Sequence, residues 1–204
     1  MKGSFDRTVK TIRILQANKE KYCDNLNVIC TVSKVNVYDL NNIDEFAKIE
    51  KWHITYNIAT EHERLNNKNK VEGFSLFTDL EAKMVAQEFF YKKFLETKSE
   101  QYFSIYSFLL TNGQHRPCGC AYLHEGITLT PEGNVCYCAT HSKIIGNALN
   151  DDIYKVYFGN APYNSELAKK YCHSCSHYMG TDLYKTDRKK YIKAMIEPWQ
   201  SFRL

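Results

Sequence analysis

Apolar and polar residues in the first part of the chain alternate between helical and strand spacing. After Ser4, which suits a helix cap, apolar residues recur every three or four positions, as on one face of a helix. These positions are Phe5, Val9, Ile12 and Leu15. The β-branched runs at 26–32 and 52–59 predict two strands instead.

Further helical patterns separate and follow these strands. A short helix is expected to begin at an asparagine cap, at 41 or 42, and to end at Glu50. Thr78 and Glu81 have the spacing of a capping box ahead of a long helix. Residues 102–110 predict another helix, and 66–70 a polar loop. The resulting order, helix–strand–helix–strand–helix, suits parallel strands in an α/β fold.

Two parallel strands do not make a stable sheet by themselves, because parallel sheets are normally covered on both faces and flanked by further strands. Residues 1–112 are therefore expected to be a fragment of a larger sheet or partial (β/α) barrel. The missing strands would come from another chain, or the open sheet edges would pair by self-association.

The pattern changes in residues 113–204, which are expected to form a small Cys-rich α+β domain. Two short strands, 126–130 and 135–138, flank a turn in which Pro131 suits the first central position and Gly133 a positive φ. This pattern predicts a β-hairpin. Helices are expected after it near 151–158, 165–171 and 188–196.

Composition limits the function classes. With 204 residues, 44% of them apolar, the chain can form a real core in one or two domains. The net charge is +4 and like charges are interspersed, which excludes a nucleic-acid-binding stripe. No signal-peptide core follows Met1, and no apolar run approaches a membrane span. We expect a cytoplasmic protein with no membrane or nucleic-acid partner.

Eight cysteines in a cytoplasmic protein indicate metal or redox chemistry and not a disulfide framework. Cys23 and Cys30 lie in or near a predicted strand and are interpreted as small buried apolar residues. The other six form three close pairs: Cys118-x-Cys120, Cys136-x-Cys138 and Cys172-x2-Cys175.

Each spacing places two thiols together. Residues two apart in a strand face the same side, so Cys136 and Cys138 are expected at one site. The loop of Cys172 and Cys175 brings two thiolates within reach of one metal centre. A [4Fe–4S] cluster takes four thiolates, but four thiolates also suit zinc. Four histidines lie nearby and are expected to be surface or outer-shell groups, although a zinc site of three cysteines and one histidine is the main alternative: His115, His141, His173 and His177.

A longer pattern joins these pairs. After Cys120 come the motifs Gly133-Asn134-Val135-Cys136-Tyr137-Cys138, Ile145-Gly146-Asn147, Asp152-Ile153-Tyr154 and Cys172-His173-Ser174-Cys175. This order resembles the auxiliary-cluster module of radical SAM enzymes, called SPASM or, when shortened, twitch. The resemblance implies a [4Fe–4S] cluster held by Cys120, Cys138, Cys172 and Cys175. Cys118 and Cys136 lie outside the match and stand in reserve as ligands.

The first region is similar to the same family. Residues 2–8 and 31–36 look like the helix before the fifth strand of the radical SAM partial barrel and that strand itself, and 52–59 like the sixth strand. The C-x3-C-x2-C motif that holds the SAM-cleaving cluster is absent from this chain, as are the first four strands. No cysteine follows Cys175, so one auxiliary cluster fits better than two.

The resemblance implies radical chemistry on a peptide, protein or small-molecule substrate, with SAM bound only if an N-terminal radical SAM half completes the barrel. The cluster in this chain would serve electron transfer or substrate positioning. Ser33 and Asn36, at the end of a barrel strand, are candidates for contact with SAM or substrate; the alternative is turn and helix capping.

Two other functions fit the cysteines. The first is a non-catalytic zinc-binding interaction module. The second is a dithiol oxidoreductase that uses Cys172 and Cys175, which would need a thioredoxin-like strand before the motif. The residues before Cys172 predict a helix, so this function ranks last.

Overall fold

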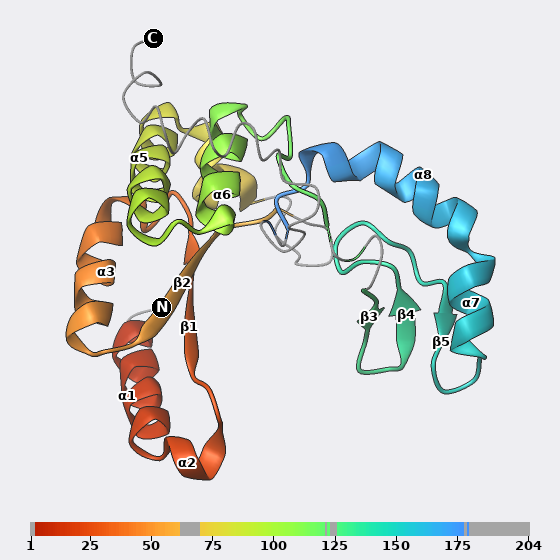
Figure 1. Cartoon of the computed structure of the whole chain (residues 1–204), viewed down its shortest axis with the longest axis horizontal. Coiled ribbons are helices and arrows are strands. Elements are labelled where there is room, and N and C mark those ends of the chain that lie inside the picture. The colour runs from red at the N-terminus through yellow and green to blue at the C-terminus, as the bar shows by residue number, and fades with distance from the viewer. Residues whose placement is uncertain (1–2, 62–69, 121, 123–125, 178, 180–204) are drawn as a thin grey trace.

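The computed structural model describes residues 3–61, 70–120, 122, 126–177 and 179 (Figure 1). The chain is a mixed α/β protein with several helices and two small sheets, as expected at the level of fold class. Helices α1, α3, α5 and α6 gather around the first sheet, while α7 and α8 lie beside the second (Figure 1). The predicted helix at 188–196 and most of the predicted loop at 66–70 lie outside the described residues.

The first sheet is formed by two parallel strands, as the element order predicted. The elements up to its second strand are α1 (Ser4–Ala17), α2 (Lys19–Tyr22), β1 (Asn27–Val32), η1 (Val37–Asp39), α3 (Leu40–Ile49) and β2 (His53–Ile58). Pairing runs from Asn27 opposite His53 to Val32 opposite Ile58. Among the described residues, neither strand pairs with a third.

Two long helices cover this sheet and hold most of the core. They are α5 (Leu80–Thr97) and α6 (Glu100–Leu110), which follow α4 (Val71–Phe74) and η4 (Leu76–Thr78). Phe94 of α5 packs on Phe103 of α6 with ring centroids 5.3 Å apart, and Phe89 meets Tyr56 of β2 edge-on at 4.9 Å. Packing between aromatic rings therefore holds α5 against α6 and against the sheet.

The helix caps differ from the predicted ones by one to three residues. Asp79, not Thr78, caps α5, and its carboxylate accepts from the Ala82 N–H at 3.1 Å. Helix α1 begins at Ser4 with Gly3 as the cap, and α3 begins at Leu40 after Asp39. The predictions at Thr78, Ser4 and positions 41 or 42 were wrong because several neighbouring residues have cap-forming side chains, and the backbone path selects among them.

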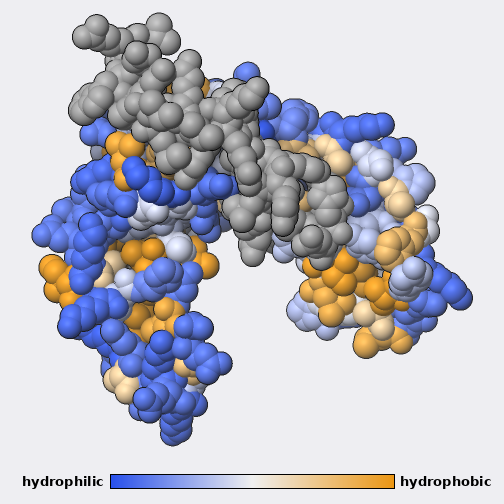
Figure 2. Space-filling view, in the orientation of Figure 1, coloured by the Kyte–Doolittle hydropathy of each residue, from blue (hydrophilic) through white to orange (hydrophobic). Residues whose placement is uncertain are grey.

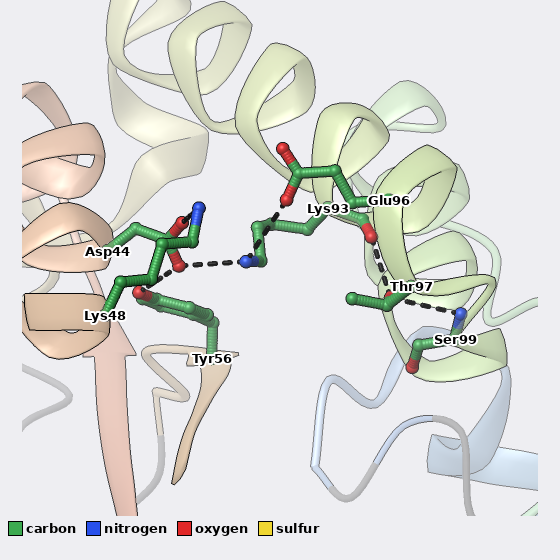
Figure 3. A network of polar contacts seen from close by, with 7 residues as sticks. All are labelled: Asp44, Lys48, Tyr56, Lys93, Glu96, Thr97 and Ser99. Carbon is green, nitrogen blue, oxygen red and sulfur yellow. Dashed lines mark hydrogen bonds and ion pairs between the residues drawn. The ribbon is translucent and has the colours of Figure 1, made fainter. Parts of the chain in front are cut away.

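Buried charge links the sheet to the helices. Asp44 Oδ1 accepts from Lys93 Nζ at 2.8 Å and from the Tyr56 hydroxyl at 2.9 Å, while Lys48 pairs with Oδ2 at 2.7 Å (Figure 3). Figure 3 shows that these side chains come from α3, α5 and β2 and converge on one carboxylate. The carboxylate is thus satisfied by several donors, which a buried charge requires.

The second sheet contains the predicted hairpin and a third strand that the sequence pattern missed. Its elements and those that follow are β3 (Thr128–Leu129), β4 (Asn134–Cys136), β5 (Gly146–Asn147), α7 (Ile153–Gly159), α8 (Ala161–Tyr171) and η6 (Cys172–Ser174). The strands are antiparallel in the order β3-β4-β5. Gly133 has a φ of 81°, as its place in the turn predicted.

Contacts cross between the two regions. Cys118, before the second sheet, and Met179, after it, are buried in the core formed by the first region. Ser176 Oγ also donates to Thr60 Oγ1, or accepts from it, at 3.1 Å. The division at 112/113 stays a prediction, but the chain on both sides of the second sheet is attached to the first region.

Two apolar areas reach the surface (Figure 2). One lies on the hairpin, where Ile127, Leu129 and Leu149 are exposed. The other borders a groove of about 570 Å³ between α1, β1 and α3, with Ile29 and Phe46 among its lining residues. No helix within the described part of the chain combines the length and the apolar character needed to cross a membrane.

Candidate metal centre

Four cysteine side chains line one small cavity at the end of the second region. Cys120 comes from the segment before β3, Cys138 from the bend after β4, and Cys172 and Cys175 from η6 and the residue after it. These are the four residues that the family resemblance selected from the six clustered cysteines. Tyr137, Leu167 and Tyr171 contribute large side chains to the wall.

A bend after β4 separates Cys136 from Cys138. The strand ends at Cys136, and the Tyr137 N–H then donates to Ser142 Oγ at 3.0 Å instead of continuing the ladder. Cys138 leaves the strand and faces the cavity, whereas Cys136 stays fully buried and does not line it. The expectation that both would face one site was wrong, because strand alternation applies only while the strand continues.

The other cysteines lie apart from the cavity. Cys118 packs into the core of the first region. Cys30 packs against that same core, in line with its interpretation as a small apolar residue, and Cys23 is half-buried. Neither Cys118 nor Cys136 lines the cavity, so their location does not support a role as replacement ligands.

The end of α8 shapes the Cys172–Cys175 loop. The helix gives way to the single turn η6, and Cys175 takes an extended conformation. Tyr171, the last residue of α8, stacks on His141 with ring planes 2° apart and centroids at 4.5 Å. This stack places the loop of Cys138 against the loop of Cys172.

Backbone N–H groups point at two of the sulfurs. The His141 N–H lies 3.3 Å from Cys138 Sγ, and the His177 N–H lies 3.4 Å from Cys175 Sγ. Hydrogen bonds to cysteine sulfur stabilise the thiolate and are among the factors that set the potential of iron–sulfur centres. The loops thus present thiols with donors already aimed at them.

Arg116 is the residue of this site that the sequence analysis missed. It is buried and lines the cavity. Its guanidinium donates to the carbonyl oxygens of Cys118, Gly119, Cys175 and His177. Nothing in the sequence distinguished this arginine from a surface one, apart from its place two residues before a cysteine pair.

Burial and neighbouring cysteines raise the pKa of two of the thiols, Cys120 and Cys172. The pKa of Cys172 is raised to about 11, first by burial and then by the neighbouring Cys120, Cys175 and Cys138. The pKa of Cys120 is raised by burial, and the Arg116 charge opposes this rise. All four cysteines line the same cavity. Metal binding would have to displace protons from them.

Two of the four nearby histidines reach the cavity. His141 and His177 line it, and burial lowers the pKa of each, so both imidazoles are neutral at pH 7. His115 and His173 are exposed, and His173 instead offers its carbonyl to the Arg116 N–H at 2.6 Å. Of these four histidines, only His141 and His177 line the cavity with the four cysteines.

The four thiols line one cavity. Within the described residues, no three His, Cys, Asp or Glu side chains are arranged to hold a single metal ion. Zinc requires sulfurs about 2.3 Å from one centre. A four-iron cluster takes one thiolate at each iron, so four cysteines are the number of ligands that it needs. The cavity is small: about 20 Å³ is open to a water-sized molecule. A cluster is larger than this, so its binding would require the thiol side chains to rotate outward.

Ser33 and Asn36 form a local turn after β1. Asn36 Oδ1 accepts from the Ser33 N–H at 2.8 Å, and Asn36 Nδ2 donates to the Thr31 carbonyl at 3.0 Å. Neither residue lines the cysteine cavity. Their observed contacts are the local hydrogen bonds of a turn, as the turn-capping alternative expects. Contact with SAM or substrate stays a prediction.

No protein-family model, curated protein or solved structure matches this chain. The functional argument therefore depends on the residues and geometry described above.

Proposed function

We propose that this chain binds one auxiliary [4Fe–4S] cluster through Cys120, Cys138, Cys172 and Cys175. The observation that carries the proposal is that thiols from three separate segments line a single cavity. Free thiols this concentrated, in a wall that also holds a buried arginine and sulfur-directed N–H groups, suit an anionic centre bound by cysteine.

A bound cluster supplies one-electron transfer. The chain's own residues have simpler tasks: the thiolates bind, the N–H groups of His141 and His177 stabilise charge on sulfur, and the rings of Tyr137 and Tyr171 exclude water. Since α8, a helix, precedes Cys172, the strand that a thioredoxin-like dithiol site needs is absent from that position.

We further propose that the chain is the cluster-binding part of a radical SAM oxidoreductase or maturase, in which the cluster serves electron transfer or positions a peptide or small-molecule substrate. The first region would be a fragment of its partial (β/α) barrel. Support comes from the parallel pair β1–β2, which no third described strand joins, and from the apolar groove beside it. An N-terminal half carrying C-x3-C-x2-C would cover this surface and supply SAM binding.

Metal analysis of anaerobically purified and reconstituted protein tests the cluster. We expect about four irons and four sulfides per chain, with a brown colour and broad absorption that reduction bleaches. Stoichiometric zinc with no iron uptake would contradict the proposal. Light scattering of the same sample tests whether the open edges of the β1–β2 sheet cause self-association. A monodisperse monomer would favour a separate partner half.

Zinc binding in an interaction module is the second candidate. One observation favours it: the neutral imidazoles of His141 and His177 lie on the same cavity as the four cysteines, so three thiolates and one imidazole are available. A colourless protein with one zinc per chain, which is lost when one of the two histidines is replaced and kept when the other is, would identify this function.

A further inference from the structure

Arg116 connects the cysteine-bearing segments from within. Its Nη2 donates to the Gly119 carbonyl at 2.8 Å and its Nε to the Cys118 carbonyl at 3.0 Å. Its Nη1 reaches the other side of the cavity, to the carbonyls of Cys175 at 2.9 Å and His177 at 2.6 Å. One side chain therefore contacts the backbone just before Cys120 and the backbone at and just after Cys175.

Only arginine has the geometry for these contacts. The guanidinium is planar and carries five N–H donors in a fixed fork, whereas a lysine ammonium is a single point with three donors. Arg116 is only 7% exposed, so its charge has lost most of its contact with water. The four carbonyl oxygens replace that water as hydrogen-bond acceptors, and the buried charge is tolerated for this reason. Its side chain and the two backbone segments thus depend on each other for hydrogen bonds.

The charge of Arg116 acts on the cavity it lines. Its side chain lines the cavity together with all four cysteine side chains. A group with four thiolate ligands is anionic, and a nearby cation stabilises its more reduced state. The position of the guanidinium therefore affects both the geometry and the electrostatics of the site.

We propose that Arg116 is the positioning residue of the cysteine cavity: its buried guanidinium holds the segment of Cys120 against the segment of Cys175 and keeps a positive charge beside their sulfurs. This inference rests on the proposed cluster site and adds to it a residue that touches no iron.

Two substitutions separate the roles of shape and charge. Arg116→Lys keeps the charge but loses the fork, so the reconstituted protein should release iron to a chelator about tenfold faster with little change in midpoint potential. Arg116→Gln also loses the charge, and its potential should fall by about 59 mV, a tenfold change in the ratio of reduced to oxidised centre. Arg13→Gln, which removes an exposed arginine paired with Glu50, is the control and should match the wild type in both.

A readout without metal tests positioning separately. In the metal-free protein, iodoacetamide should modify Cys120 and Cys175 about tenfold faster in Arg116→Lys than in wild type, with the rate at Cys30 unchanged. Equal alkylation and equal iron release in wild type and Arg116→Lys would overturn the inference. If Arg116→Gln fails to fold by circular dichroism, Arg116→Lys still decides. A wild-type protein that takes up no iron would refute the cluster, while alkylation would still decide the role of Arg116.

Discussion

The ammonium of Lys93, on α5, lies 2.8 Å from Asp44 Oδ1, on α3, and each side chain is only 10% exposed. Burial by itself raises the pKa of Asp44, but hydrogen bonds from Lys48, Lys93 and Tyr56 outweigh it and leave the pKa below its usual value. The Asp44 carboxylate therefore stays ionised at neutral pH, and the pair links the helix between the two parallel strands to the long helix that covers them (Figure 3).

Replacing Lys93 with methionine should lower the free energy of unfolding by about 3 kcal/mol, because it leaves the Asp44 charge buried without its buried cation. Urea denaturation measures the change. Lys92→Met, at the exposed neighbouring position, should shift stability by no more than about 0.5 kcal/mol. The double variant Lys93→Met with Asp44→Leu should recover part of the loss. An equal effect at both lysines would show that the ion pair contributes nothing.

Alanine substitution distinguishes ligands from reserve cysteines. Replacing Cys120, Cys138, Cys172 or Cys175 should reduce iron affinity at least about tenfold, since even outer-shell changes at metal sites cost this much. Cys118→Ala and Cys136→Ala should keep full iron content after reconstitution, although both positions are buried and some stability will be lost. Iron loss in Cys136→Ala as great as in Cys138→Ala would restore the interpretation that both face the site.

Stability of the metal-free protein should depend on alkaline pH through Cys172. Its pKa in the folded protein is raised to about 11, so folding favours the neutral thiol. This contribution is fully present below the pKa of the unfolded chain, about 8.5, and is lost as the pH rises through that of the folded protein. Thermal unfolding between pH 8 and 11 should show a falling midpoint, and Cys172→Ala should flatten the fall. A slope that is unchanged by the substitution would contradict the assignment.

Gly133 is required by both conformation and space. Its φ is 81°, and a Cβ there would lie 2.9 Å from Leu149 Cγ and 3.2 Å from Asn147 Oδ1. Gly133→Ala should therefore cost about 1–2 kcal/mol in unfolding free energy and loosen the hairpin before Cys138. Gly159→Ala is the matched control, because nothing lies within 4 Å of a Cβ at that position and φ is not positive. It should be neutral or slightly stabilising.

Substitution of Asn36 distinguishes the two roles considered for the turn after β1, which are turn capping and contact with SAM or substrate. Asn36→Ala removes a bond to the Ser33 N–H and one to the Thr31 carbonyl, so stability should fall by about 1 kcal/mol. Iron content should not change, since Asn36 does not line the cysteine cavity. SAM binding to a preparation that includes the partner half provides the discriminating measurement: loss of binding well beyond the loss of stability would favour ligand contact.

Local patterns predicted most of the secondary structure. The apolar spacing of α1, the β-branched runs of β1 and β2, and the turn at Gly133 depend on residues close in the chain, and the structure has each of them. The parallel pairing also followed from element order. Caps and the short strand β5 were missed, because many residue types can begin a helix and a two-residue strand carries no periodicity.

The sequence by itself determined that six cysteines are concentrated in the second region, in pairs whose spacing suits metal ligands. Only the tertiary structure decided which side chains share a cavity. It did so by ending β4 at Cys136, which turned Cys138 inward, and by burying Arg116 between segments some sixty residues apart. Hydrogen bonds between such distant segments leave no periodic trace in the sequence, because periodicity records only the local geometry of one helix or strand.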